Sequence, residues 1–508
     1  MSSKVLSATT LGLSSHLVEV EADTHSGAHM FSIVGLPDAA VKESKDRVDS
    51  AIKNSGFRPP HRCGHITINL APADIKKEGP LYDLPIALGI LSATKQLRAE
   101  TGNRLFIGEL SLNGDIRPVS GVLPIAILAK EKEISEIVVP AANAKEAAIV
   151  DGLSVIPARS LKELVAHLKG ERKIRPENPQ DLSEIFEPQK YMADMAYIKG
   201  QEYAKRALEV AAAGGHNVLL SGPPGSGKTL LARTFPSILP PLTFPEALEV
   251  TKIFSIAGKL TRGISLISER PYRAPHHSAS AVSLVGGGTF PRPGEISLSH
   301  RGVLFLDEFP EFSRPVLENL RQPLEDGMIS VSRAQATLSF PARFTLIAAM
   351  NPCPCGNATD PEKLCSCTPA SIVKYQRKIS GPILDRIDIH AEVPRMKFEK
   401  MADVKVGEES ESIRKRVISA RERQQKRFEN VDGIIANSEM QNQHIKKFCP
   451  LGEKEMALLR QAVDSLHLSA RAFHRIIKIA RTIADLAGSD AIEVPHLAEA
   501  IQYRQRQV

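Results

Sequence analysis

One stretch of the sequence has the residue types and the spacing of a phosphate-binding loop: Gly222, Pro223, Pro224, Gly225, Ser226, Gly227, Lys228 and Thr229. An apolar segment precedes it and a helical pattern follows it, which is the context that this motif requires. The glycines let backbone N–H groups face phosphates at a helix N-terminus, Lys228 can reach the terminal phosphates, and Thr229 can hold Mg²⁺. We therefore predict a site for ATP with Mg²⁺.

Two further apolar segments end in polar side chains suited to such a site. Val303–Leu306 is followed by Asp307 and Glu308, and Thr345–Met350 is followed by Asn351. The carboxyl ends of strands are where an α/β sheet presents groups to its ligand. We expect Asp307 to take the magnesium ion, Glu308 to orient or deprotonate the attacking water, and Asn351 to contact the γ-phosphate or that water.

Arginines near the C-terminal third are candidates for stabilising the transferred phosphoryl group. Arg386 lies between Asp385 and Asp388, so it is either an arginine supplied to a neighbouring subunit or part of a local ion pair. Arg471 and Arg475 lie one turn apart on an amphipathic helical pattern. Either could reach over the nucleotide from a helical lid.

The helices and strands that position these groups are expected to lie in several separate domains. Its 508 residues exceed one core, since domains commonly hold about 100–200 residues. Alternating strand and helix patterns predict α/β structure before and after a polar, proline-bearing stretch, and the last part is helical throughout. We predict an α/β domain at 1–170, a linker at 171–195, an α/β core carrying the phosphate loop at 196–398, and a helical lid at 399–508.

The composition is that of an ordinary globular protein, with 42% hydrophobic and 24% charged residues. No apolar run approaches the roughly 18 residues that span a bilayer, and the first 54 residues lack the order of a secretory signal. We expect a cytoplasmic protein. The net charge of +7 has the sign expected of a nucleic-acid partner but is small for this length.

Four of the six cysteines are clustered: Cys353, Cys355, Cys365 and Cys367. Four thiolates are the number that closes a tetrahedral structural zinc site, although the commoner two-residue gap within each pair is absent here. Reduced thiols that pack a loop and redox chemistry are the alternatives. A zinc site here would be structural, because all four ligands would come from the protein.

A hairpin is predicted between the carboxylates and Asn351, from alternating patterns at 328–332 and 336–340. Its turn contains Arg333 and Gln335, and Arg333 could contact a nucleic-acid phosphate or be a solvated charge. The stretch from Arg270 to Pro293, which includes His276 and His277, resembles the inserted loop found in one branch of ring-forming ATP motors, and that resemblance implies that it could also enter the pore. We interpret the two histidines as structural residues rather than metal ligands.

Several of these residues together resemble the AAA+ branch that contains magnesium-chelatase motor subunits. Longer strings narrow the resemblance to the magnesium-chelatase-like ComM family, also called YifB: Arg273-Ala274-Pro275-His276-His277-Ser278, Gly286-Gly287-Gly288, Pro293-Gly294-Glu295-Ile296 and Asn351-Pro352-Cys353-Pro354-Cys355-Gly356. The resemblance covers nearly the whole chain. It implies a ring, expected to be a hexamer, that uses ATP to move along single-stranded and branched DNA and to drive branch migration during natural transformation.

The first 170 residues resemble the Lon protease domain, on Gly108–Val119 and Gly121–Ala129. Lon-type proteins have a serine after a Gly-Pro pair and a lysine after the second glycine-rich turn. This chain has Leu81 and Leu123 at those positions, so peptide hydrolysis lacks its nucleophile and base. We expect this domain to be structural or to guide DNA.

The alternative function is a chelatase-type motor that remodels a protein partner, which would need the same ATP site. A remodelling pore more often presents an aromatic side chain at its hairpin tip, and the sequence has none between Ser330 and Thr337. That difference favours DNA, whereas Leu81 and Leu123 oppose an ATP-regulated protease.

Overall fold

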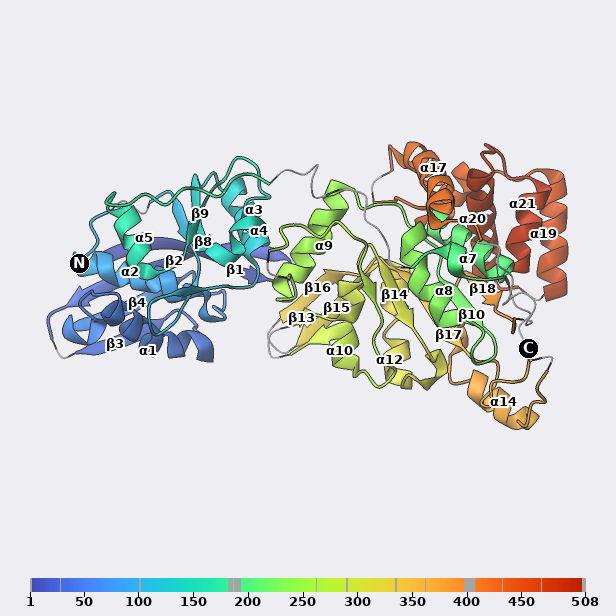
Figure 1. The fold of residues 1–508 in the computed structure, drawn as a ribbon, viewed down its shortest axis with the longest axis horizontal. Helices are drawn as coiled ribbons and strands as arrows, with labels where there is room; N and C mark the ends of the chain where they lie inside the picture. Colours follow the sequence, from blue (N-terminus) through green and yellow to red (C-terminus); the bar gives the residue numbers. More distant parts are fainter. Residues whose placement is uncertain are drawn as a thin grey trace. The chain divides into compact units, whose positions relative to one another are not determined.

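The computed structural model describes residues 2–504 except 28, 100–101, 181–185, 187–192, 262, 289–290, 334–335, 361, 397–406, 432 and 467, and only the backbone of residues 332, 333 and 336. The chain divides into two units (Figure 1). The first unit comprises Met1–Glu187 with Phe244–Ser268, and the second comprises Pro188–Thr243 with Glu269–Val508. No helix in the described ranges has both the length and the apolar composition needed to cross a membrane.

The first unit is built on a seven-stranded sheet with the order β3-β4-β2-β1-β5-β8-β9. β2 pairs antiparallel with β1 and β4, and the other neighbours are parallel. Alternate side chains of β4 are buried, as expected of a strand with one covered face. The strands are β1 (Ser2–Leu11), β2 (Ser14–His25), β3 (Met30–Val34), β4 (His65–Ala71), β5 (Arg104–Phe106), β8 (Glu136–Pro140) and β9 (Ser154–Ala158), with a small hairpin of β6 (Glu109–Leu110) and β7 (Ile116–Arg117).

Helices α2 and α3 cover this sheet by packing against β1 and β2. Nearly every residue of α2 is buried, which explains why its sequence has no polar face. The N-terminus of α1 is capped by Asp38, whose carboxylate accepts the N–H of Val41 at 2.7 Å. The helices are α1 (Ala39–Asn54), α2 (Asp83–Ala93), α3 (Val122–Glu131), α4 (Ala144–Ala147), α5 (Leu161–Leu168) and α9 (Phe244–Ile256).

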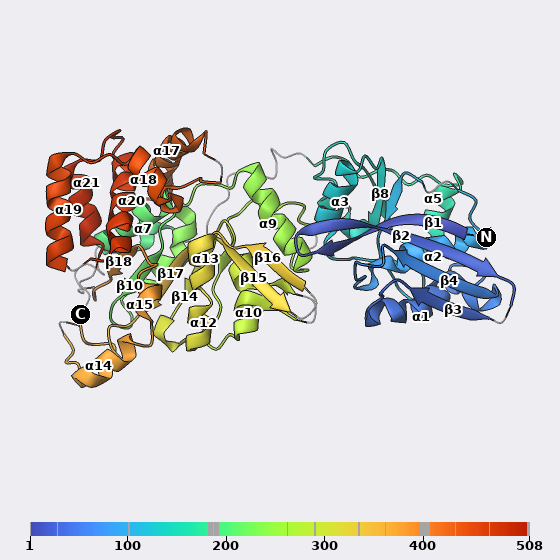
Figure 2. The ribbon, with the colours of Figure 1, turned by 180° about the vertical axis from the view of Figure 1, so that it is seen from behind.

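The second unit contains a five-stranded parallel sheet with the order β11-β14-β17-β10-β18. Its strands are short and almost entirely buried, which is typical of parallel sheets covered on both faces. The strands are β10 (Val218–Ser221), β11 (Tyr272–Arg273), β14 (Val303–Leu306), β17 (Thr345–Met350) and β18 (Ile389–Glu392). Two ribbons stand outside this sheet: β12 (Gly286–Gly287) pairs with β13 (Arg292–Pro293), and β15 (Met328–Arg333) pairs with β16 (Ala336–Pro341). Figure 2 shows the ribbon of β15 and β16.

Helices surround the sheet and form the C-terminal part of the second unit. Those associated with the sheet are α7 (Glu202–Gly214), α8 (Lys228–Thr234), α10 (Ala281–Val285), α11 (Glu295–Leu298), α12 (Arg314–Glu318), α13 (Arg321–Asp326), α14 (Pro369–Gln376) and α15 (Gly381–Leu384). The C-terminal helices are α17 (Ser410–Phe428), α18 (Asn442–Phe448), α19 (Glu453–Leu466), α20 (Ala470–Leu486) and α21 (Val494–Gln502).

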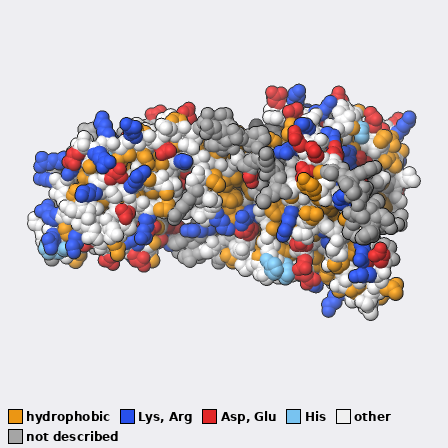
Figure 3. Space-filling model, in the orientation of Figure 1, with side chains coloured by type: hydrophobic (Ala, Val, Ile, Leu, Met, Phe, Trp, Pro, Cys, Tyr) orange, Lys and Arg blue, Asp and Glu red, His pale blue; other side chains and the backbone are white. Residues whose placement is uncertain are grey.

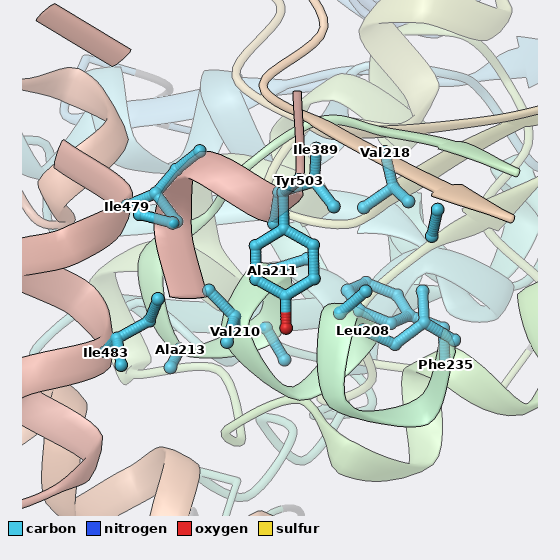
Figure 4. Packing of buried hydrophobic residues seen from close by; sticks show 14 of the residues in the cluster. Leu208, Val210, Ala211, Ala213, Val218, Phe235, Ile389, Ile479, Ile483 and Tyr503 are labelled. Atoms are coloured by element: carbon cyan, nitrogen blue, oxygen red, sulfur yellow. The ribbon is translucent and has the colours of Figure 1, made fainter. Parts of the chain in front are cut away.

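One hydrophobic core joins the sheet to the C-terminal helices (Figure 4). Leu208 and Val210 of α7 pack in the same cluster as Ile479 and Ile483 of α20. Tyr503, after α21, is 1% exposed and lies in this cluster as well. The predicted fold class is confirmed: two α/β regions are followed by a helical C-terminal region.

Candidate nucleotide site

The phosphate loop connects strand β10, which lies between β17 and β18, to helix α8. Gly222 leaves the strand with its N–H donating to the carbonyl of Met350 at 3.3 Å. A Cβ at this position would lie 2.1 Å from the carbonyl oxygen of Val393, so a larger residue would push the neighbouring strand end away. Gly227 caps α8 with a φ of 96°, a conformation that glycine adopts without strain. The loop thus ends at the N-terminus of a helix, where anions bind.

The predicted site residues from three strand ends meet around this loop. The Thr229 hydroxyl donates to Oδ2 of Asp307 at 2.7 Å, and Lys228 Nζ donates to Oδ1 of Asn351 at 3.2 Å. Lys228 Nζ also donates to the carbonyls of Gly222 and Pro223, at 2.7 and 2.9 Å. Since β14, β17 and β10 are parallel neighbours, their C-terminal ends lie at one edge of the sheet.

The environment of Lys228 changes its protonation. The side chain is 8% exposed, and this burial lowers its pKa to about 8 although the nearby Asp307 carboxylate acts in the opposite direction. Burial disfavours the charged ammonium because the interior solvates it poorly. An anionic ligand placed on the loop would restore the charge.

Glu308 follows Asp307 with a φ of 52°, in the left-handed region that non-glycine residues rarely adopt. Its N–H donates to Oδ1 of Asp307 at 2.9 Å, and Oε2 of its carboxylate lies 3.0 Å from Nδ1 of His277. His277 comes from the segment after β11, which runs parallel to β14 and therefore ends at the same edge of the sheet. Its ring also meets Phe312 edge-on, with centroids 6.5 Å apart.

Two of the predicted arginines gather at one carboxylate away from the loop. Arg386 is 8% exposed and forms an ion pair with Glu325, and Nη2 of Arg471 lies 3.6 Å from Oε1 of the same residue. The Arg386 hydrogen bond holds the pKa of Glu325 below its usual range. Within the described residues, neither arginine forms a hydrogen bond or ion pair with the phosphate loop.

Arg475 has a different partner from Arg471. It forms an ion pair with the buried Asp388, which also accepts the N–H of Asn217 at 3.0 Å. Burial would raise the pKa of Asp388, but Arg475 and His216 hold it well below the usual range. Arg475 therefore fastens α20 to the start of β18, which explains why it does not point to the nucleotide site.

Sequence reasoning missed Gln201, His277 as a partner of Glu308, and Glu325. Gln201 is the N-cap of α7, and its Nε2 donates to the carbonyls of Ser226 and Pro394 at 3.3 and 2.6 Å. The signal at Gln201 was a Gly-Gln pair just before a helical pattern. His277 and Glu325 carry no local signal, because their contacts come from distant parts of the chain.

The four clustered cysteines converge as a metal site requires. The three sulfur separations among Cys353, Cys355 and Cys365 are 3.4, 3.6 and 3.7 Å, and Cys367 Sγ accepts the N–H of Cys355 at 3.4 Å. Four sulfurs at 2.3 Å from a tetrahedral zinc ion are about 3.8 Å apart. Backbone N–H groups of Asn357 and Ser366 lower the pKa of Cys355 to about 5, whereas the pKa values of Cys365 and Cys367 are raised, so Cys355 is the thiol that most readily becomes a thiolate.

The cysteine loop, residues 353–367, packs directly on the phosphate loop. A Cβ at Gly356 would lie 2.4 Å from Cδ of Pro224, and Gly356 has a φ of +83°. Only glycine fits this contact without displacing the proline. The cysteine loop is thus connected to the nucleotide site in two ways: it follows Asn351 in the sequence, and its Gly356 contacts Pro224.

The predicted hairpin before Asn351 is present as β15 and β16, which pair antiparallel from Met328↔Pro341 to Arg333↔Ala336. The side chain of Arg333 and the whole of Gln335 lie outside the described residues.

Comparison with known proteins places three family models on the chain. The model described as "Magnesium chelatase, subunit ChlI" matches residues 194–401, "Subunit ChlI of Mg-chelatase" matches 20–143, and "Magnesium chelatase, subunit ChlI C-terminal" matches 407–504. These matches cover both α/β regions and the C-terminal helices.

Similar proteins extend over the whole chain. The "Competence protein ComM" of Haemophilus influenzae is 45% identical over 504 residues, which are 98% of this chain and 97% of that protein. The protein YifB of Escherichia coli is 43% identical over 97% of this chain and 95% of its own length. Lon protease 2 of Bacillus subtilis is 28% identical over 127 residues, 25% of this chain and 22% of its own length.

Proposed function

The chain belongs to the ComM (YifB) family of magnesium-chelatase-like AAA+ ATPases, and we propose that it hydrolyses ATP to move along DNA. The observation that carries the ATPase is the meeting of Thr229 with Asp307 and of Lys228 with Asn351 at one edge of a parallel sheet. These groups come from three strand ends and together offer what a triphosphate needs: a cation, a metal-binding pair and a polar contact.

Each residue has a role that follows from its position. The backbone N–H groups of the loop, which Pro223 and Pro224 lack, would cradle the phosphates, and the Lys228 ammonium would bind the terminal ones. Asn351 would contact the γ-phosphate or the attacking water. Glu308 would accept a proton from that water, and its Oε1 is the carboxylate oxygen that does not face His277.

Magnesium fits the oxygens of Thr229 and Asp307, which are already in contact and include one carboxylate. When bound, the ion neutralises charge on the phosphate oxygens. ATP and Mg²⁺ are the ligands that membership of an AAA+ ATPase family implies.

We assign Arg386 and Arg471 to a neighbouring subunit's nucleotide in a ring, which we propose to be a hexamer. Their shared partner Glu325 keeps both guanidinium groups side by side. Such groups stabilise the charge on the transferred phosphoryl group when they act in trans. A pair that makes no hydrogen bond to the described phosphate loop of its own chain is consistent with this assignment.

DNA is the partner that we infer, in single-stranded and branched form, with branch migration during natural transformation as the activity. The Haemophilus relative is named a competence protein. The hairpin of β15 and β16 precedes β17, the strand that leads to Asn351, and is the candidate DNA contact, with Arg333 at the end of β15. Basic and acidic side chains are interspersed on the visible face (Figure 3), so contact with phosphates would rest on local groups rather than on a broad basic surface. A cytoplasmic location follows from this partner.

A protein-remodelling motor is the second candidate. It is favoured by the family models, all three of which are named for a magnesium-chelatase subunit. The two candidates share the ATP site and differ in whether DNA accelerates hydrolysis.

We also infer that the four cysteines hold a structural zinc ion. Their sulfur separations of 3.4 to 3.7 Å are close to those of a tetrahedral site and far longer than a disulfide bond. All four ligands would be protein groups, so the ion would stiffen the cysteine loop and take no part in hydrolysis.

The catalytic assignment is tested by separating binding from hydrolysis. Glu308→Gln should bind ATP as the parent does and hydrolyse it at least about 100-fold more slowly, while Lys228→Ala should lose affinity. The matched control is Glu311→Gln, because Glu311 is a nearby carboxylate that pairs with Lys378 instead, at 2.8 Å. Parental hydrolysis by Glu308→Gln would show that the base has been assigned wrongly.

A further inference from the structure

The helix that follows the phosphate-loop helix does not stay with the second unit. α8 continues into a short 3-10 turn, Phe235–Ile238, and five residues later the chain enters α9. The segment Phe244–Ser268, here called the arm, groups with Met1–Glu187, here called the N-terminal domain, and α9 packs against α3. The N-terminal domain therefore holds a segment that leads directly from the nucleotide site.

Ser255, in the last turn of α9, is the centre of this contact. Its hydroxyl donates to Oε1 of Glu146 at 2.5 Å, and its carbonyl accepts the N–H of Gly121 at 3.1 Å. Ser255 and Glu146 are 2% and 4% exposed. A buried polar pair is costly to separate, because each group would lose its partner without gaining water. Close packing continues at Gly258, where a Cβ would lie 2.9 Å from Oγ of Ser120.

Within the N-terminal domain, further hydrogen bonds hold the Glu146 carboxylate in place. Oε1 also accepts the N–H of Leu123 at 2.9 Å, and Oε2 accepts Nδ2 of Asn143 at 3.0 Å. Asn143 is itself fixed by two hydrogen bonds to the backbone of Val119, at 3.1 and 3.0 Å. Leu123 stands where Lon-type proteins have the catalytic lysine. In this chain the backbone at Leu123 instead positions Glu146, which binds Ser255 of the arm.

The residues that flank the arm are joined to each other within the second unit. Arg270 Nε donates to the carbonyl of Pro240 at 2.6 Å and Nη2 to that of Pro241 at 3.2 Å, so one side chain ties the residues before the arm to those after it. Leu239 and Leu242 on either side of the prolines are 5% and 4% exposed. Two prolines with fixed φ between buried anchors leave little freedom to absorb a displacement of α8.

We propose that the arm transmits nucleotide-dependent movement of α8 to the N-terminal domain, through the Pro240-Pro241 link and the Ser255–Glu146 contact. This inference rests on the proposed ATPase function and gives the domain without protease residues a role in the ATP cycle. In this proposal the ATPase core moves the N-terminal domain, and the arm is the segment through which it does so.

Hydrogen exchange of the full chain tests the proposal, in the Glu308→Gln background so that ATP stays bound. ATP should slow exchange in peptides of the phosphate loop and change exchange at residues 119–131 and 143–150 by about threefold or more. Ser255→Asp, which places two carboxylates together, should keep the first effect and lose the second. The Pro240→Gly, Pro241→Gly double variant should do the same without touching the contact itself.

Thr251→Val is the matched control, because the Thr251 hydroxyl is as buried as Ser255 but, among the described residues, its hydrogen bonds lie within the arm, to Ala247 and Ile267. It should keep both effects. If ATP protects the phosphate loop but does not change exchange in the N-terminal peptides, the inference is wrong and the ATPase assignment stands. The same holds if the change in the N-terminal peptides persists in both Ser255→Asp and the double proline variant. Absence of loop protection would contradict the ATP site itself.

Discussion

Asp307 holds two neighbours through its two oxygens: Thr229 on one and the N–H of Glu308 on the other. This arrangement supports the left-handed backbone of Glu308, which costs on the order of 1 kcal/mol or more for a non-glycine residue. The strained turn presents the Glu308 carboxylate at the edge of the sheet, where His277 binds it. The residue that we assign as the base is thus placed by its neighbours and restrained by a histidine.

The lowered pKa of Lys228, about 8, predicts how ATP affinity depends on pH. Below pH 8 the free protein already carries the ammonium that the phosphates need, so affinity should be nearly constant. Above pH 8 the free protein loses this proton and binding must restore it, so affinity should fall with a slope approaching about tenfold per pH unit.

This dependence can be measured by titrating a fluorescent ATP analogue into Glu308→Gln between pH 7 and 9.5. Lys228→Arg is the control, because a guanidinium stays charged over this range, and its profile should be flat. A flat profile in the chain that retains Lys228 would contradict the assignment of this pKa to ATP binding.

Among the elements, the cysteine loop and the phosphate loop are in direct contact at Gly356 and Pro224. The described residues of the cysteine loop, 353–360 and 362–367, form no strand or helix. Convergent thiolates with a bound metal would give it rigidity, and that rigidity would reach the nucleotide site through Pro224.

The purified protein should accordingly contain about one zinc ion per chain, measured by elemental analysis. Cys365→Ser should release the metal and weaken ATP binding several-fold, because the contact on Pro224 loosens. Cys63→Ser, which changes a cysteine outside the cluster, should retain both metal and affinity. If the purified protein contains no metal, binds ATP normally and shows no change in affinity when zinc is added, the zinc proposal is wrong.

Local patterns predicted the elements well, and contacts between distant elements poorly. Strands ending at Asp307 and Asn351 could be predicted because each is a short apolar run with a polar residue after it. The arm looked like part of the second α/β region, because sequence continuity says nothing about where a helix docks. The partners Glu325 for Arg386 and Asp388 for Arg475 likewise depend on tertiary packing.

For the whole molecule, the proposed role of the arginines at Glu325 means that a working nucleotide site would need two subunits. Arg386→Ala and Lys228→Ala should each be inactive alone, and a mixture should regain part of the ATPase rate, since each subunit supplies what the other lacks. Mixing Glu308→Gln with Lys228→Ala is the control, because both changes damage the same side of the site and no rescue is expected. Failure of the first mixture to regain activity would count against action in trans.

The central claim is that DNA drives the ATPase, and steady-state ATP hydrolysis tests it most directly. The rate should be measured without DNA, with single-stranded DNA and with branched DNA, each at low and high salt. We predict stimulation of several-fold by DNA that diminishes at high salt, because phosphate contacts release counterions. A rate indifferent to either DNA at both salt concentrations would contradict the claim and favour a motor that acts on a protein partner.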